Sequence, residues 1–261
     1  MATEEPEYQL IGLHTRYSSW TSRVEAVLEY FQIPYNPVFV KIPDVQSNQI
    51  KAVSPTGFVP VLECRSLGST PIGDSLAICE FLAESHPELP LWPRDRQLRA
   101  LARSVASQMH SGFSALRGTF HANFIARYTG NVPVSADARK DVQRILSIWG
   151  EARKTTKERL LALGEADEGF LFGGFSIADA FFWPVLWRFR TYDLPLDTAS
   201  EDALIWMAQM WNDPVFRGLA DKYYEQSEDP ETVIAHYDDI YRGQQDIQYG
   251  QFPRDWNFSA V

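Results

Sequence analysis

The spacing of apolar residues changes near residue 93, and this change restricts the folds that the chain can adopt. Residues 8–92 alternate strand-like runs such as "YQLIGLH" and "VPVLEC" with helical runs such as "SRVEAVLEYFQ" and "DSLAICEFLAESHP". From residue 94 to about 225 nearly every segment has the spacing of an amphipathic helix. The sequence therefore predicts an α/β domain over residues 1–92, an all-α domain over 93–225 and an extension over 226–261.

The remaining elements are predicted from the same spacing and from turn residues. Two further strands are expected over 33–41 and 69–73. Helices of the second domain are expected over 97–120, 136–163, 175–190, 201–211 and 213–226. In the extension we expect one more helix over 230–243 and an extended tail over 248–261.

Two pairs of residues match the capping box, in which residues at the start of a helix satisfy each other's backbone groups. Ser176 and Asp179 form one pair, with aspartate in place of the usual glutamate, and Ser22 and Glu25 form the other. We assign the first pair to structure, because a buried cap stabilises a helix by about 1 kcal/mol.

Composition excludes several classes of function. The chain has 261 residues, a net charge of −10 and no basic block, which argues against nucleic acid as its main partner. No window approaches the roughly eighteen uninterrupted apolar residues of a membrane helix, and the acidic start lacks the order of a signal peptide. Two cysteines and five histidines without metal-ligand spacing complete the prediction of a cytoplasmic protein with no membrane partner and no metal.

The turn "RYSSWTSRV" carries more hydroxyl groups than a helix start needs. Tyr17, Ser18, Ser19, Thr21 and Ser22 lie between an apolar strand and a helical run. Serine is a preferred N-cap, so one of these hydroxyls is expected to begin the helix. The others are then available to contact a substrate.

Three segments, in order, carry a family resemblance: "SPTGFVPVLE" at 54–63, "IGDSLAICEFLAESHPE" at 72–88 and "GGFSIADAFFWPVL" at 173–186. Ser18, Ser19 and Arg23 also match the zeta-class pattern of two serines, three further residues and an arginine. Together these features resemble the cytosolic glutathione transferases of serine type, zeta-like or theta-like, with similarity to bacterial and fungal members. The resemblance implies a thioredoxin-like first domain that binds the co-substrate glutathione, a helical second domain that shapes the pocket for a small hydrophobic electrophile, and a homodimer.

The resemblance assigns glutathione-binding roles to four residues. Asp74 and Ser75 stand where the family holds the γ-glutamyl end, whose carboxylate suits a helix N-terminus and whose ammonium suits an aspartate. Val59 and Pro60 stand where the family has a cis peptide bond that leaves backbone groups free for the cysteinyl part. Without the resemblance, Asp74 and Ser75 would be interpreted as an ordinary N-cap, and Pro60 as a strand-initial proline.

The resemblance also assigns the activation of the thiol to a serine. A free thiol titrates near pH 8.5, and a hydroxyl that donates a hydrogen bond to the sulfur stabilises the thiolate. The zeta pattern puts this role on Ser18, whereas theta-like spacing puts it on Ser19. Both remain open, and we favour Ser18.

One residue departs from the family pattern. Phe58 stands where many relatives have Lys or Gln before the Val-Pro pair, and phenylalanine cannot hydrogen-bond glutathione. Lys41 and Lys51 are weak candidates to replace it. Arg103 and Arg117, on a helix expected to face the first domain, are candidates to bind an acidic electrophile.

Three functions are compatible with these residues. The first is conjugation of glutathione to a hydrophobic electrophile, and the second is glutathione-dependent cis–trans isomerisation of an unsaturated diacid. The third is a non-catalytic protein that binds a ligand or a partner, with the acidic extension as its interaction element.

Overall fold

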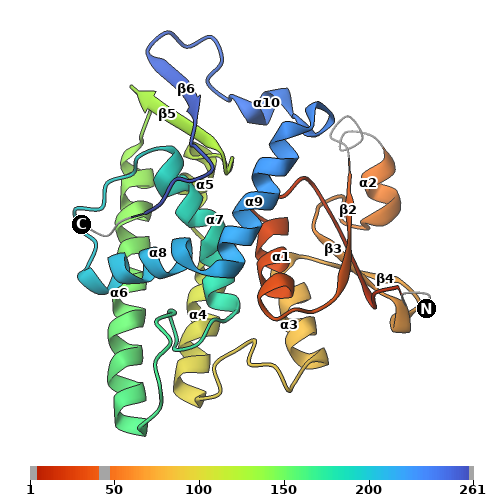
Figure 1. Ribbon diagram of the computed structural model, residues 1–261, viewed down its shortest axis with the longest axis vertical. Coiled ribbons are helices and arrows are strands. Elements are labelled where there is room, and N and C mark those ends of the chain that lie inside the picture. Colours follow the sequence, from red (N-terminus) through yellow and green to blue (C-terminus); the bar gives the residue numbers. More distant parts are fainter. Residues whose placement is uncertain (1–4, 41–47, 259–261) are drawn as a thin grey trace.

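A four-stranded mixed sheet forms the centre of the first domain in the computed structural model, which describes residues 5–40 and 48–258 (Figure 1). The strand order is β2-β1-β3-β4, with β1 parallel to β2 and the other pairs antiparallel. Its strands are β1 (Tyr8–Gly12), β2 (Tyr35–Phe39), β3 (Val61–Cys64) and β4 (Thr70–Gly73). The four predicted strands are confirmed.

Helices cover both faces of this sheet. Helix α1 (Thr21–Tyr30) and helix α3 (Ser75–Ser85) lie on one face, and the short α2 (Asn48–Val53) lies on the other (Figure 1). The apolar spacing predicted α1 and α3 but not α2, which is only six residues long. A single helical turn carries too few residues to show a periodic apolar face.

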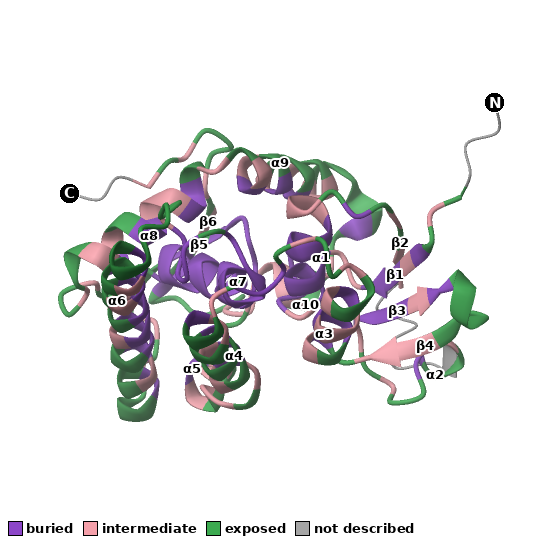
Figure 2. Cartoon of the chain, turned by 90° about the horizontal axis from the view of Figure 1, so that it is seen from below, coloured by how far each residue is buried: buried purple, intermediate pink, exposed green. Residues whose placement is uncertain are grey.

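The second domain is built around one fully buried helix. All fifteen residues of α7 (Ile177–Thr191) are buried, and α7 packs against α1 of the first domain (Figure 2). The other helices are α4 (Arg96–Ser111), α5 (Ser114–Thr119), α6 (Ala136–Leu163), α8 (Glu201–Asn212) and α9 (Pro214–Glu228). The predicted helices over 136–163, 175–190, 201–211 and 213–226 are confirmed.

The single helix predicted over 97–120 is wrong. The helix ends at Ser111, because Gly112 is extended and Phe113 is in the left-handed region with φ of 56°. A Cβ atom at position 112 would lie 2.8 Å from the carbonyl oxygen of Gln108, so glycine is required there. The chain then changes direction and α5 begins.

The second domain is helical as predicted, except for one short strand that the sequence did not predict. Strand β5 (Ala126–Gly130) pairs antiparallel with β6 (Ile247–Gln251), which belongs to the extension (Figure 1). Gly130 has φ of 99°, and a Cβ there would collide with the carbonyl of Asp246. The extension is therefore joined to the second domain by a strand pair.

The helix predicted over 230–243 is replaced by two short pieces. The 3-10 turn η3 (Pro230–Thr232) is followed by α10 (Ala235–Asp238), and the chain then turns into β6. The tail predicted over 248–261 begins as the end of β6 and is irregular from residue 252 to 258.

The two capping boxes predicted from sequence have different outcomes. The Asp179 carboxylate accepts hydrogen bonds from the backbone nitrogen and the hydroxyl of Ser176, which confirms the cap of α7. Ser22 does not cap α1, because Trp20 stands at the N-cap and the Ser22 hydroxyl donates to the Ser19 carbonyl. The Glu25 carboxylate instead accepts bonds from Thr15 and Tyr223 inside the protein.

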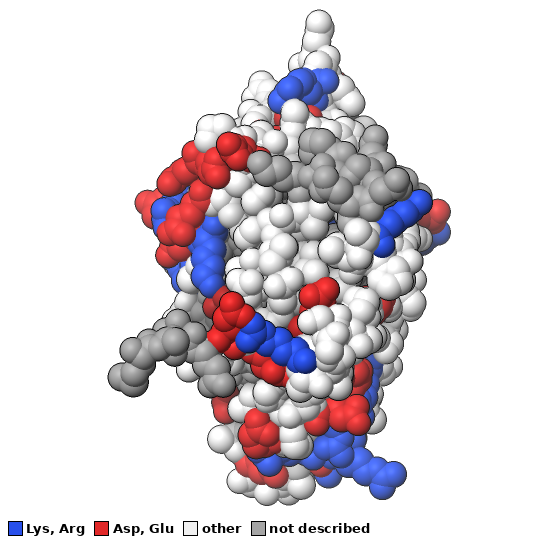
Figure 3. Space-filling view, turned by 90° about the vertical axis from the view of Figure 1, so that its right-hand side faces the viewer, with Lys and Arg blue, Asp and Glu red and all other residues white. Residues whose placement is uncertain are grey.

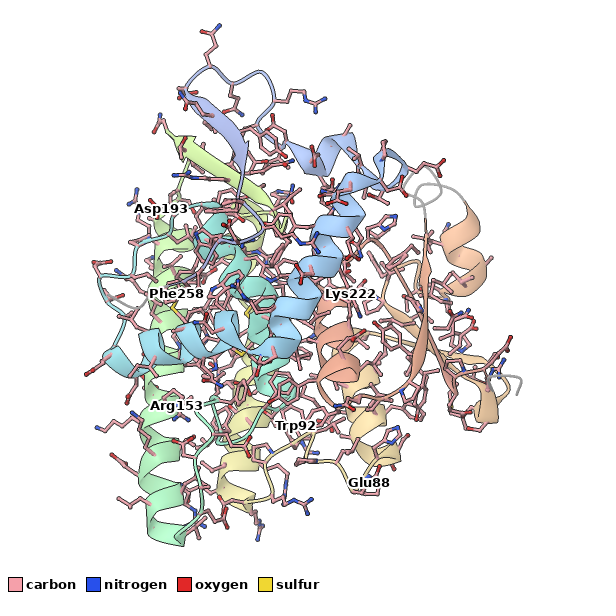
Figure 4. All side chains as sticks on the ribbon, viewed as in Figure 1. Glu88, Trp92, Arg153, Asp193, Lys222 and Phe258 are labelled. Carbon is pink, nitrogen blue, oxygen red and sulfur yellow. The ribbon has the colours of Figure 1, made fainter. Side chains whose placement is uncertain are left out.

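Helix α9 ties the second domain to the first. Lys222 Nζ lies 2.5 Å from Glu29 Oε1, and the Tyr223 hydroxyl lies 2.9 Å from Glu25 Oε2, so two residues of α9 bind α1. Figure 4 labels Lys222 on α9. Burial raises the pKa of Glu25 to about 7. These contacts, with the packing of α7 on α1, set the position of the first helix between the domains.

Charged side chains are interspersed on the outer face of the first domain. In Figure 3, Lys and Arg alternate with Asp and Glu around a largely uncharged centre. Within the described residues no helix combines the length and the hydropathy of a bilayer span. The same part of the chain contains no group of three or more His, Cys, Asp and Glu side chains arranged to hold a metal ion.

Candidate functional site

Three segments that are distant in sequence meet at one edge of the sheet. Val61 pairs with Ile11 on one side and with Gly73 on the other. The start of β3 therefore lies between the end of β1 and the end of β4. The Val59–Pro60 pair, the serine turn after β1 and the Asp74–Ser75 pair after β4 all continue from this edge.

The start of α3 presents a hydroxyl group without a partner. Asp74 is the N-cap: its Oδ1 accepts from the backbone nitrogens of Leu76 at 2.8 Å and Ala77 at 3.2 Å. The Ser75 side chain is buried, and its Oγ has no hydrogen-bond partner among the described residues. A buried hydroxyl donor at the positive end of a helix dipole is suited to bind a carboxylate.

The Val59–Pro60 peptide bond is cis, as the resemblance implies. Pro60 is buried and Val59 is half-buried, directly before the β3–β4 ladder begins. The preceding Phe58 projects outward with 78% of its surface exposed. Lys51 is exposed on α2, and Lys41 lies outside the described residues.

The two serines of the turn have different hydrogen bonds. Ser18 Oγ lies 2.8 Å from Thr21 Oγ1 and accepts from the Thr21 backbone nitrogen at 3.2 Å, so it serves the start of α1. Ser19 Oγ accepts from Arg188 Nη2 at 3.4 Å, which leaves its own proton free to be donated. Both side chains are more than nine-tenths buried.

His110, on α4, links the serine turn to the start of α3. Its Nε2 lies 3.1 Å from Asp74 Oδ2, and its ring packs edge-on against Trp20 with 5.5 Å between the ring centroids. The second domain thus contributes a side chain that contacts both halves of the site. Sequence spacing alone predicted only that α4 faces the first domain.

Three arginines surround the serine turn. The guanidinium carbons of Arg23 and Arg117 lie 4.4 Å and 5.1 Å from the centre of the Trp20 ring, and Arg188 donates to Ser19. Burial, followed by the charges of Arg188 and Arg117, lowers the pKa of Arg23 to about 9. Arg23 Nη1 and Arg117 Nε have no hydrogen-bond partner among the described residues.

These three side chains form what we call the arginine cluster, Arg23, Arg117 and Arg188. The charges of Arg188 and Arg117 disfavour the charged form of Arg23, and an anion placed between like charges stabilises them. Of the two arginines considered from sequence, Arg117 belongs to the cluster, whereas Arg103 binds Glu80 with two hydrogen bonds of 3.2 and 3.1 Å. Arg188 was missed, since its place on a buried helix gives no local sequence signal.

Fold and site together define a two-domain protein with a thioredoxin-like first domain and a helical second domain. A model of the glutathione S-transferase N-terminal domain matches residues 17–85, and a model of the C-terminal domain matches residues 100–212. The chain therefore belongs to the glutathione S-transferase family, in which glutathione is the co-substrate.

Several curated relatives match part of this chain. Maleylacetoacetate isomerase of Dictyostelium discoideum is 32% identical over 44% of this chain and 55% of its own length. Glutathione S-transferase Z1 of Arabidopsis thaliana is 35% identical over 37% of this chain and 45% of its own length. Pyrimidodiazepine synthase of Drosophila melanogaster is 37% identical over 34% of this chain and 37% of its own length. The chain thus spans about half, or less, of each of these relatives.

Solved structures support the fold. Ure2p in complex with glutathione has a TM-score of 0.62 and 20% identity, covering 83% of this chain and 96% of that chain. Glutathione transferase F2 from Populus trichocarpa has a TM-score of 0.62 and 16% identity, covering 84% of this chain and 99% of that chain. The predicted thioredoxin-like domain followed by a helical domain is confirmed.

Proposed function

We propose that this chain binds glutathione at the shared sheet edge and activates its thiol for addition to an electrophile. The observation that supports the proposal is the strand register, from which the serine turn, Val59–Pro60 and Asp74–Ser75 all continue at one edge of the sheet. The relatives named glutathione S-transferase and the neighbour in complex with glutathione support it.

In this proposal each segment holds one part of the tripeptide. Ser75 Oγ, which has no partner among the described residues, and the N-terminus of α3 bind the γ-glutamyl carboxylate, and Asp74 accepts from its ammonium group. The backbone of Val59 pairs with the cysteinyl part in the manner of an added strand. Ser18 or Ser19 then donates a hydrogen bond to the sulfur and lowers the pKa of the thiol.

Replacing Ser75 by alanine is expected to weaken glutathione binding. A hydrogen bond to a charged group contributes about 1.5–3 kcal/mol, so the dissociation constant rises about 10- to 100-fold. Isothermal titration calorimetry measures the change. Ser107→Ala, which alters an exposed serine of α4, serves as the matched control and should bind normally. Equal affinity of Ser75→Ala and Ser107→Ala would contradict the assignment of the γ-glutamyl site.

The arginine cluster favours an electrophile that carries a carboxylate. Arg23 Nη1 and Arg117 Nε lack partners among the described residues beside the serine turn, where the thiolate is proposed to form. Relatives named maleylacetoacetate isomerase support the second candidate function, isomerisation of an unsaturated diacid. In that reaction the thiolate adds to the double bond, the carbon–carbon bond rotates, and the same thiol is eliminated, so that no glutathione is consumed.

One experiment separates the candidate functions. The protein is incubated with glutathione and either a neutral aryl halide or a maleyl diacid, and glutathione and isomer content are followed together. Consumption of glutathione supports conjugation, and a change of isomer without consumption supports isomerisation. Absence of thiolate absorbance on mixing with glutathione would support the non-catalytic alternative and reject both enzymatic ones.

Replacing Arg117 by glutamine is expected to affect acidic electrophiles selectively. Loss of one charge-assisted contact to a carboxylate raises the KM for the diacid about 10-fold, while the KM for a neutral aryl halide changes less than about twofold. Arg103→Gln is the matched control, because Arg103 is paired with Glu80 and lies outside the cluster. Equal changes for both substrates in Arg117→Gln would show that the cluster does not select charge.

The homodimer and the cytoplasmic location remain proposals based on the family. A two-fold dimer is tested by light scattering coupled to size-exclusion chromatography, which distinguishes one chain from two by mass.

A further inference from the structure

The extension reaches back to the residues before the serine pair, and the carboxylate of Asp238 binds two of their side chains. Asp238, the last residue of α10, has Oδ1 2.8 Å from the Tyr17 hydroxyl and 3.3 Å from Arg16 Nη1. Arg16 is completely buried, and Asp238 is its ion-pair partner. Arg16 and Tyr17 directly precede Ser18 and Ser19, so this carboxylate binds the turn one residue before the serine pair. Figure 1 shows α10 between β6 and the first domain.

Asp238 is itself held by the second domain. Asn123 Nδ2 donates to the carbonyls of Tyr237 at 3.2 Å and Asp238 at 3.0 Å. The Tyr128 hydroxyl, on β5, accepts from the backbone nitrogen of Ile240 at 3.1 Å. The chain that follows α10 is joined to the second domain by the β5–β6 strand pair. The position of the Asp238 carboxylate is therefore determined by the second domain and the extension, not by the sheet.

The second domain and the extension also make two contacts with the backbone of the turn. The Phe124 nitrogen donates to the Arg16 carbonyl at 2.8 Å, and the Arg16 nitrogen donates to Gln226 Oε1 at 3.3 Å. Gln226 Nε2 also lies 3.0 Å from Thr15 Oγ1. Residues 15–17 are thus bound on several sides by groups from outside the first domain.

Asp238 accepts hydrogen bonds from both side chains, Arg16 and Tyr17. Burial raises the pKa of Tyr17, which remains a protonated donor to the carboxylate. Arg16 Nε and Nη2 have no hydrogen-bond partner among the described residues, so removal of Asp238 would leave a buried guanidinium without a counter-charge. A buried charge that loses its partner moves toward water or draws in another group, and either movement displaces the attached turn.

We propose that Asp238 is a positioning residue: through Arg16 and Tyr17 it fixes the serine turn in the geometry that activates the glutathione thiol. This inference rests on the proposed function, and it gives a role to the extension, which lies beyond both matched family regions. Asp238 does not touch the tripeptide site at α3 or at Val59–Pro60. Its removal is therefore expected to change thiol activation more than glutathione affinity.

The test compares Asp238→Asn with the wild-type chain. Small displacements of an activating group cost up to about 100-fold in rate, so we expect kcat to fall about 10-fold in this variant. The thiol pKa of bound glutathione, followed by thiolate absorbance against pH, should rise by about one unit, in line with that tenfold loss. Measured at about pH 5, where the thiol stays protonated and its ionisation does not contribute to binding, the dissociation constant of glutathione should change by less than about twofold, since the α3 contacts are intact.

Two additional variants separate positioning from general loss of structure. Tyr17→Phe removes the 2.8 Å hydrogen bond to Asp238 and the contact of the same hydroxyl with the Ile234 backbone but keeps the Arg16 ion pair, and it should shift the thiol pKa in the same direction by a smaller amount. The effects of Tyr17→Phe and Asp238→Asn should be less than additive when combined, because both act through one contact. Asp246→Asn, which alters an exposed aspartate of the extension bonded to Asn131, is the matched control and should behave as wild type.

The outcomes distinguish the two proposals. If the wild-type chain binds glutathione without ionising its thiol, the proposed function fails regardless of Asp238. Suppose instead that the wild-type chain ionises the thiol. If Asp238→Asn and Tyr17→Phe then both have the wild-type thiol pKa and the wild-type kcat, the positioning role is rejected. A fall in glutathione affinity at about pH 5 equal to the fall in kcat would also reject it, because with the thiol protonated that result indicates damage to the whole site.

Discussion

Replacing Asp179 by alanine is expected to lower the free energy of unfolding by about 3–5 kcal/mol, because a buried carboxylate is removed from the donors it satisfies. Asp179 accepts from the Leu171 nitrogen at 2.8 Å, the Trp206 indole at 2.9 Å, and the nitrogen and hydroxyl of Ser176 at 3.0 and 3.1 Å. Alanine leaves these donors buried without an acceptor at the start of α7. Since α7 packs on α1, we expect the loss in urea unfolding of the whole chain.

Two variants make this measurement specific. Asp137→Ala, in the first turn of α6, alters an exposed aspartate paired with Lys140 and should change stability by no more than about 0.5 kcal/mol. Asp179→Asn keeps one acceptor oxygen and should fall between the alanine variant and wild type. A loss below about 1 kcal/mol for Asp179→Ala would show that the carboxylate is not needed to stabilise α7.

The difference in stability between wild type and Asp179→Asn should change with pH in a definite direction. Burial raises the pKa of Asp179 to about 6 in the folded chain, above its ordinary value of 3.8. A raised pKa contributes stability that is fully present below the unfolded pKa and is lost as pH rises through the folded pKa. The stability gap between wild type and Asp179→Asn should therefore narrow between about pH 4 and pH 6, by about 1–3 kcal/mol. Other buried acids such as Glu25 are common to both proteins and cancel in this difference.

Removing the activating serine hydroxyl is expected to slow the thiol reaction about 100-fold, the cost typical of losing one donor to a developing or stabilised anion. It should also raise the thiol pKa of bound glutathione by one to two units, in line with that rate loss. Ser18→Ala and Ser19→Ala are measured separately by thiolate absorbance against pH and by kcat. Whichever variant shows both changes identifies the hydroxyl that meets the sulfur.

The hydrogen bonds of the two serines predict a second difference. Ser18 accepts from the Thr21 nitrogen, so Ser18→Ala should also destabilise the chain by about 1 kcal/mol, because the first backbone N–H of α1 loses its acceptor. Ser19 accepts only from Arg188 among the described side chains, so Ser19→Ala leaves the start of α1 intact and should destabilise the chain by about 1–3 kcal/mol through the buried Arg188 N–H that loses its acceptor. Ser22→Ala, which loses a bond to the Ser19 carbonyl, is the control for the turn. Normal thiol pKa and kcat in both Ser18→Ala and Ser19→Ala would exclude activation by serine.

Local signals in the sequence predicted much of the fold and part of the site. The caps at Asp74 and Ser176 and the proline near the start of α9 act within one helical turn, so they can be recognised without a structure. The break between α4 and α5 could not, because apolar spacing continues through Met109, Leu116 and Phe120, and all three are buried. The chain changes direction there at two residues, and the spacing of apolar residues does not predict their backbone conformation.

Strand β5 was missed for a related reason. Its five residues, "ARYTG", carry a weak strand pattern, and their partner β6 lies more than a hundred residues later. A short strand is stable only when its backbone groups are paired, so its existence depends on a contact that sequence spacing does not report. The role of the extension was not predicted for the same reason, because its contacts are with residues distant in sequence. It was predicted to be a helix and a tail.

The sequence by itself determined which residue types begin each helix, where the α/β pattern gives way to helices, and which short segments are able to bind a tripeptide. Only the tertiary structure decided that Ser18 bonds the first residue of α1, that Arg23, Arg117 and Arg188 gather beside Ser19, and that Asp238 neutralises Arg16. Caps and helical faces depend on neighbours within four residues. Burial, unpaired donors and counter-charges depend on contacts between segments up to 222 residues apart, as between Arg16 and Asp238, which are made only when the chain has folded.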